Sequence, residues 1–187
     1  MKNIGLSIIL LFAVFSFSSC EKEDPKPEYY YSFKVNGVQK EFRLNNDGGI
    51  TFLESGANRF TLFNMVTGDV LSKNAIIMSF RNMEQIELGQ KYIMQNPIMV
   101  NGTLSPSLVL IYFDENGKEL GATLLQSSNP GALDDCSFKI TDFTTEGSVG
   151  EFEGVIFDQR DTRPLNQRTP VLITEGKFFL PNFISNL

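Results

Sequence analysis

The sequence predicts an all-β fold: an antiparallel β-sandwich in one domain that spans residues 29–187, with at most one short helical turn. From Tyr29 onward, short apolar segments alternate with turn dipeptides such as Asn36-Gly37 and Asn116-Gly117. Most of these turns lie about 8–12 residues apart, which is the spacing expected in sandwiches and barrels. The sequence also lacks the stretches of about 10–15 residues with a helical pattern that parallel βαβ units require.

Residues 1–19 match a secretory signal peptide. Lys2 supplies the cationic start, and Ile4–Phe17 is a run of mostly apolar residues. The alternative is a retained membrane-spanning anchor, but the run is shorter than the about 20 apolar residues that such a helix needs. Removing 19 of the 187 residues leaves 168, which fits one domain.

The end of the leader points to lipidation at Cys20. Ser18 and Ser19 precede Cys20, and this segment resembles the lipobox of bacterial lipoproteins, in which the cysteine is acylated and becomes the new N-terminus. Phe17 replaces the usual Leu, a departure familiar among lipoproteins of Bacteroidetes-type bacteria. Each methylene of an acyl chain that is buried in the bilayer contributes about 0.8 kcal/mol to the free energy of membrane binding. The two or three palmitate-type chains that the resemblance implies would therefore hold the protein on a membrane. The alternative is a free thiol or a disulfide with Cys136.

Residues 20–28 are predicted to form an acidic, proline-containing tether. Six charges and two prolines between Glu21 and Glu28 cannot build a core. At about 3.1 Å per residue, the tether would separate the domain from the lipid by about 25 Å. The acidic stretch resembles the surface-export signal of Bacteroidetes lipoproteins, while the other interpretation is a linker that is merely soluble.

The first predicted hairpin is formed by Tyr31–Val35 and Val38–Leu44, with positive φ angles expected at Asn36 and Gly37. Leu108–Phe113 is apolar at almost every position and is expected to lie centrally in its sheet. The further predicted strands are Arg59–Val66, Ala75–Phe80, Lys91–Met94, Ser107–Phe113, Leu120–Leu125, Ser137–Phe143, Gly150–Phe157 and Val171–Leu180.

Three local predictions interrupt the strand pattern. Asn82–Leu88 is the one helical candidate, because Asn82 and Gln85 have the spacing of a helix cap. A β-bulge is expected at Gly154, because Phe152 and Val155 have opposite parity. The segment 159–170 has no apolar pattern and is predicted to be a long loop.

These features together resemble the secreted lipoproteins of Bacteroidetes-type bacteria. The resemblance is carried by the Cys20 leader, Phe33–Gly37, Leu88–Tyr92 and Ile173–Phe178, with the strand pair Phe138–Phe143 and Glu151–Phe157 before the last of these. The resemblance implies a compact β-sandwich on a lipid tether, and it assigns no activity.

Composition removes several kinds of chemistry. The chain contains no His, which excludes a Ser-His-Asp triad, a Cys-His pair and any His-ligated metal site. The net charge is −6, or −7 once Lys2 leaves with the leader, so nucleic acid is not an expected partner. No cofactor and no metal are expected. Asp114–Glu119 lacks the spacing of a calcium loop and is predicted to be a turn, and Asp134 and Asp135 are predicted to be solvated.

The candidate functional side chains are few. Glu151 and Glu153 would lie on one face of a strand, about 7 Å apart. That separation suits a glycosidase, but ordinary alternation produces the same pattern, and we do not predict an enzyme. Cys136 is expected to be a buried apolar residue.

Exposed aromatic rings that stack on sugars are the better candidates for binding: Tyr29, Tyr30, Tyr92 and Tyr112. The alternative is that these rings pack in the sheet and only their hydroxyls reach water.

The sequence therefore predicts a lipid-anchored protein of the outer membrane, at the cell surface or otherwise facing the periplasm, that binds or scaffolds. The membrane, through the lipid anchor, and a glycan or another envelope protein are the expected partners. The alternative is a structural subunit of an outer-membrane or fimbria-like assembly, held by strand addition at a sheet edge. A carboxylate-based hydrolase is the least favoured hypothesis.

Overall fold

The computed structural model describes residues 28–43, 49–55, 58–66, 73, 75–82, 84 and 86–186. The predicted leader, Cys20 and all of the predicted tether except Glu28 lie outside these residues. The described strands are β1 (Tyr30–Val35), β2 (Val38–Arg43), β3 (Gly49–Ser55), β4 (Asn58–Val66), β5 (Ala75–Asn82), β6 (Lys91–Ile93), β7 (Pro97–Val100), β8 (Thr103–Pro106), β9 (Leu108–Phe113), β10 (Glu119–Ala122), β11 (Asp135–Phe143), β12 (Ser148–Asp158), β13 (Val171–Leu180) and β14 (Asn182–Asn186).

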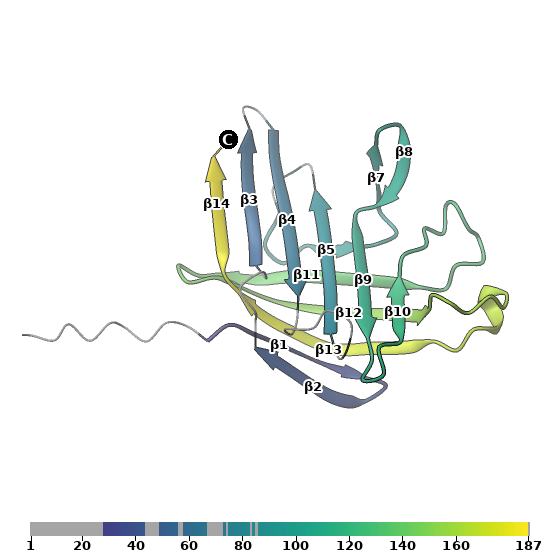
Figure 1. Ribbon diagram of the computed structural model, residues 1–187. Coiled ribbons are helices and arrows are strands. Elements are labelled where there is room, and N and C mark those ends of the chain that lie inside the picture. The colour runs from purple at the N-terminus through teal and green to yellow at the C-terminus, as the bar shows by residue number, and fades with distance from the viewer. Residues whose placement is uncertain are drawn as a thin grey trace, which may run out of the picture.

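The strands form two layers, which confirms the predicted all-β class. Layer 1 has the pairing order β14-β3-β4-β5-β9-β10, and layer 2 has the order β6-β11-β12-β13-β1-β2. In Figure 1 the strands of layer 1 stand upright, and the strands of layer 2 run across them. Crosswise packing is one of the two ways in which sheets cover each other. The layers are continuous at one corner, where Leu120 and Gly121 of β10 pair with β12. β7 and β8 form a separate hairpin.

One pairing departs from the antiparallel prediction. β14 runs parallel to β3, while the other pairings in the described residues are antiparallel. β13 continues into β14 through Pro181 without reversing, so the chain leaves layer 2 and joins the edge of layer 1. The carbonyl oxygen of Pro181 accepts a hydrogen bond from the Ile50 N–H (2.9 Å), which fixes this corner.

The first hairpin is confirmed in detail, but the helical candidate is wrong. Asn36 and Gly37 have φ angles of 47° and 83°, as a type I′ turn requires.

Asn82 ends β5, and the described residues up to Leu88 form no helix. The one helical turn in the described chain is the 3-10 turn η1 (Leu165–Gln167), inside the predicted loop 159–170. That loop lacks an apolar pattern, so its turn had no sequence signal.

Aromatic side chains from both layers meet in the core. Phe33 of β1 packs edge-on against Tyr112 of β9, with ring centroids 6.0 Å apart. Phe80 of β5 packs against Phe138 of β11 at 4.7 Å. These side chains are all buried, so the two layers share one apolar interior. The opposite face of layer 2 is therefore left to solvent.

The described residues contain no helix that is long and apolar enough to cross a membrane.

Candidate functional site

The structure separates the four tyrosines that were predicted to bind a ligand. Tyr30 is 38% exposed and projects from the outer face of β1. Tyr29 is half-buried, with its ring 5.1 Å from that of Phe179 and its hydroxyl donating to the carbonyl oxygen of Glu146 (2.7 Å). These two rings remain candidates for ligand contact, at the end of the domain where the chain enters.

Tyr92 and Tyr112 are not exposed platforms, which corrects the prediction for these two residues. Tyr112 is 2% exposed and lies in the core. Tyr92 is stacked on Phe138 at 5.5 Å, and its hydroxyl accepts a hydrogen bond from the Glu87 N–H (2.9 Å). Both rings pack as the alternative interpretation expected. The sequence could not distinguish the two cases, because an isolated Tyr suits a half-buried strand in either orientation.

The outer face of layer 2 carries three ion pairs between described residues. The strand register aligns Lys91 with Lys139, Lys139 with Glu151, and Glu151 with Lys177. This row crosses β6, β11, β12 and β13 at one level, and its side chains all point away from the core. Ser137 and Glu153 form part of the next row along the same strands.

A β-bulge in β13 adds Glu175 to this second row. Between Phe152 and Gly154, β12 advances two residues while β13 advances three, from Gly176 to Ile173. The register irregularity is thus where it was predicted, but the extra residue lies in β13 and not at Gly154. Glu175 has a φ of 53°, in the left-handed region that non-glycine residues rarely adopt. A Cβ at Gly176 would overlap the carbonyl oxygen of Phe152, so the bulge needs glycine there.

Three ion pairs hold these side chains in place. The Nζ of Lys91 lies 2.6 Å from a carboxylate oxygen of Glu153. The Nζ of Lys139 lies 3.0 Å from Glu151, and the Nζ of Lys34 lies 2.6 Å from Glu175. Exposed pairs of this kind add only about 0–1 kcal/mol each to stability, so their main effect is to orient the groups. Among the described residues, no carboxylate pairs with Lys177, although Glu151 is its cross-strand neighbour.

The charged rows line a groove. A hollow of about 310 Å³ lies over Lys91, Lys139, Glu151, Glu175 and Lys177. A second hollow of about 230 Å³ shares Lys91, Ser137 and Glu153 with it and continues toward Val155 and Leu172. The groove presents ammonium donors, carboxylate acceptors and the Ser137 hydroxyl, which suits a ligand rich in polar groups. No Tyr is among the residues that line either hollow.

Glu153, one of the two glutamates considered above for glycoside hydrolysis, lacks the raised pKa of a general acid. The hydrogen bond from Lys91 lowers the pKa of Glu153 below its ordinary value. A general acid in glycoside hydrolysis needs a raised pKa instead, because it must be protonated when it meets the substrate. The geometry at Glu153 therefore favours binding over proton donation.

The remaining sequence candidates are structural. Cys136 is 2% exposed, and burial raises the pKa of its thiol, as expected for an unreactive core residue. Asp114 accepts hydrogen bonds from the N–H groups of Asn116 (2.8 Å) and Lys118 (2.9 Å), which confirms a turn. Within the described chain, no group of three or more acidic or cysteine side chains is placed to hold a metal ion.

The prediction of solvated aspartates is wrong for Asp134. This side chain is 2% exposed, and its Oδ2 accepts hydrogen bonds from the N–H groups of Thr123 (2.7 Å) and Leu124 (3.0 Å). It thereby fastens the chain that follows β10. Its neighbour Asp135 is half-buried and accepts from the N–H of Cys136 (2.8 Å). Burial raises the pKa of Asp135.

Comparison of the chain with family models, with curated proteins and with solved structures finds no match.

Proposed function

We propose that this chain is a lipid-anchored envelope protein whose domain binds a polar ligand across the outer face of layer 2. The groove over Lys139 and Glu151 is the observation that carries the proposal. The leader and Cys20 support the lipid anchor, and residues 20–28 support a tether that leaves the domain free of the lipid surface. The proposed location is the outer membrane, at the cell surface.

The chemistry of the groove favours a glycan or a polar segment of another envelope protein. Each lysine ammonium has three hydrogens, and each carboxylate has several lone pairs, so the three ion pairs leave donors and acceptors for a ligand. The pairs also hold these side chains in position before binding, which reduces the entropy lost when a ligand is ordered against them. A hydroxyl-rich ligand uses both kinds of group.

A glycan array probed with the full chain in neutral detergent tests the binding proposal. The variant to compare is Lys139→Ala with Glu151→Ala, which removes one pair from the groove and leaves the net charge unchanged. The matched control is Lys40→Ala with Glu115→Ala, which removes a pair that does not line the groove. We expect the first variant to lose binding and the control to keep it. Equal binding by both variants, or an array on which no glycan is bound, would contradict the proposal that the groove binds a glycan.

A membrane-impermeant amine reagent on intact cells tests the surface location separately. The proposal expects the exposed Lys91 and Lys177 to be labelled without disrupting the outer membrane. Protection of both lysines until the cells are opened would place the domain inside the envelope.

A structural subunit is the second candidate, and the sheet edges favour it. β2 pairs only with β1, and β14 pairs only with β3, within the described strands. Each free edge presents backbone groups that could pair with a strand of a partner. Isolation of the protein from membranes after cross-linking distinguishes the two candidates. A stoichiometric partner cross-linked at β2 or β14 favours assembly, and a groove-dependent glycan favours binding.

A further inference from the structure

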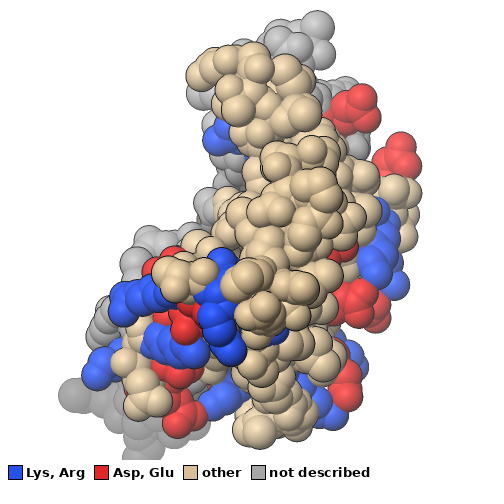
Figure 2. Space-filling view, turned by 90° about the vertical axis from the view of Figure 1, so that its right-hand side faces the viewer, with Lys and Arg blue, Asp and Glu red and all other residues tan. Residues whose placement is uncertain are grey.

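The arginines of this chain are concentrated in one loop. Three of the six arginines, Arg160, Arg163 and Arg168, lie within nine residues of each other. They belong to the segment 159–170 between β12 and β13, which we call the arginine loop. The loop lies at the right-hand end of layer 2 in Figure 1. Seen from that end, charged side chains gather on the lower part of the molecule, below a largely uncharged surface (Figure 2).

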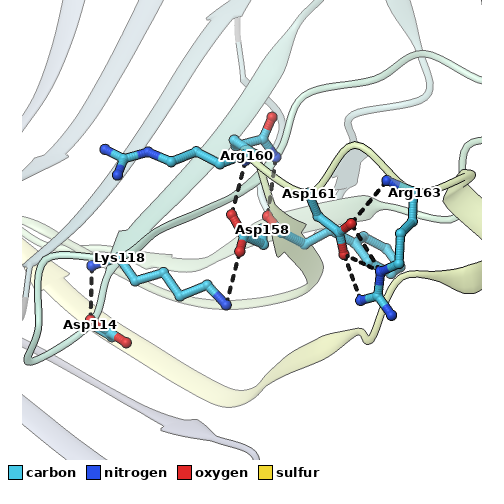
Figure 3. A network of polar contacts seen from close by, with 8 residues as sticks. Asp114, Lys118, Asp158, Arg160, Asp161 and Arg163 are labelled. Atoms are coloured by element: carbon cyan, nitrogen blue, oxygen red, sulfur yellow. Dashed lines mark hydrogen bonds and ion pairs between the residues drawn. The ribbon is translucent and has the colours of Figure 1, made fainter.

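The arginine loop has a defined structure. Asp161 receives three hydrogen bonds from the Arg163 side chain, at 2.7, 3.0 and 3.1 Å (Figure 3). These bonds are the main reason that the pKa of Asp161 is lowered to about 2. The Nε of Arg168 donates to the carbonyl oxygen of Arg163 (2.9 Å), next to the 3-10 turn η1. The loop therefore holds its arginines in a fixed arrangement.

Two of the three arginines in the loop form no ion pair with a described carboxylate. The guanidinium of Arg163 pairs with the carboxylate of Asp161. The Nζ of Lys118 lies 2.9 Å from Oδ2 of Asp158 and pairs with that carboxylate. In the described part of the chain, no carboxylate lies within ion-pair distance of the guanidinium of Arg160 or Arg168. Figure 3 shows the side chain of Arg160 extending away from Arg163. Two guanidinium groups without an ion-pair partner thus stand on a protein with a net charge of −6.

The arginine loop is remote from the point where the tether enters the domain. Tyr30, at the start of β1, pairs with Phe179, whereas the loop joins β13 at Val171. Eight residues of strand span about 26 Å, at about 3.3 Å per residue. If the chain is anchored at Cys20, as proposed above, the loop lies at the end of layer 2 away from the anchor. That position favours a ligand in the surrounding medium over lipid headgroups of the same membrane.

The side chains around the arginines indicate the class of ligand. Apart from its prolines, the loop has one apolar residue, Leu165, which is half-buried, and it has no aromatic residue. The centre of a protein interface usually contains several apolar or aromatic anchors, and this loop has no aromatic residue and only Leu165 as an apolar one. Guanidinium groups suit hydrated anionic groups instead, because their N–H groups match the geometry of carboxylate and sulfate oxygens. We propose that the arginine loop is a second binding site, which takes an anionic polysaccharide through Arg160 and Arg168.

Binding of the full chain in neutral detergent to immobilised dextran sulfate and polygalacturonate tests this inference, with neutral dextran as the blank. The test variant is Arg160→Gln with Arg168→Gln. The control Arg81→Gln removes an exposed arginine of β5, and Arg160→Lys with Arg168→Lys keeps both charges. Circular dichroism checks that each variant is folded. Arg163 is left unchanged because it organises the loop.

We expect the wild-type chain to bind at least one of the two anionic polymers. The double glutamine variant should bind about tenfold more weakly, taking about threefold for each exposed ion pair. The Arg81→Gln control should bind like the wild type. The lysine variant should bind more tightly than the glutamine variant, because it keeps both charges, and more weakly than the wild type, because it lacks the guanidinium geometry. Binding should also weaken as salt is added.

Three results would overturn the inference. The first is that neither anionic polysaccharide binds, and the second is that the double glutamine variant binds as well as the wild type. The third is tighter binding to phosphatidylglycerol vesicles, polyglutamate or duplex DNA than to the polysaccharides, which would assign the loop to another class of partner. These outcomes do not depend on the groove of layer 2, because the variants tested there leave the arginine loop unchanged.

Discussion

Replacement of Asp134 by alanine should destabilise the domain more than replacement of the adjacent Asp135. Asp134 accepts hydrogen bonds from two backbone N–H groups, and the side chain is buried. Hydrogen bonds to a charged acceptor contribute about 1.5–3 kcal/mol each. Burial of the carboxylate offsets part of this gain, because Oδ1 has no hydrogen-bond partner among the described residues. We therefore expect Asp134→Ala to lower the free energy of unfolding by about 2–4 kcal/mol.

Urea unfolding measures the difference. The chain has no Trp and five Tyr, so tyrosine fluorescence and far-ultraviolet circular dichroism are the suitable signals. With a slope near 2 kcal/mol per molar urea, the midpoint of Asp134→Ala should fall by about 1–2 M. Asp135→Ala is the matched control. Burial already opposes ionisation of Asp135, so its removal should cost less than about 1 kcal/mol. Equal midpoints for the two variants would refute the role given to Asp134.

Three further outcomes follow from buried or paired groups. Tyr31→Phe should leave the midpoint of thermal unfolding unchanged or raise it, because the buried Tyr31 hydroxyl has no hydrogen-bond partner in the described structure. A lower midpoint would show that the hydroxyl forms a stabilising hydrogen bond. Arg163→Gln should raise the pKa of Asp161 from about 2 toward its ordinary value, as followed by NMR. Because the folded pKa is the lower one, the stabilisation by this pair should be present at neutral pH and disappear as the pH falls toward 2. The Cys136 thiol should react with a thiol reagent only on unfolding, since burial raises its pKa, and rapid reaction of the native protein would contradict that burial.

The local part of the fold was predictable from sequence, because hairpin signals are local. Asn36-Gly37 specified both the turn and the strands that flank it. Asn101 and Gly102 form a second turn with positive φ angles, of 49° and 79°. The strands on either side of it were missed, because Pro97 and Pro106 stand at their ends and prolines argue against a strand.

The non-local part could not be predicted in the same way. The parallel pairing of β14 with β3 joins segments that are far apart in the chain, and no residue pattern specifies it. The groove depends on a register that brings Lys91, Lys139, Glu151 and Lys177 to one level. Alternation predicted that Glu151 and Glu153 lie on one face of a strand, but not which residues of other strands become their neighbours. Asp134 was misjudged because loop position alone suggested solvent, while its partners are the backbone N–H groups of residues 123 and 124.

The intact mass of the protein extracted from bacterial membranes tests the central claim most directly. The account predicts a chain that begins at Cys20 and carries two or three acyl chains, and a Cys20→Ser variant that is neither acylated nor retained on the membrane. A mature chain with an unmodified Cys20, or one that still carries residues 1–19, would contradict the proposal that this β-sandwich is displayed on a lipid anchor.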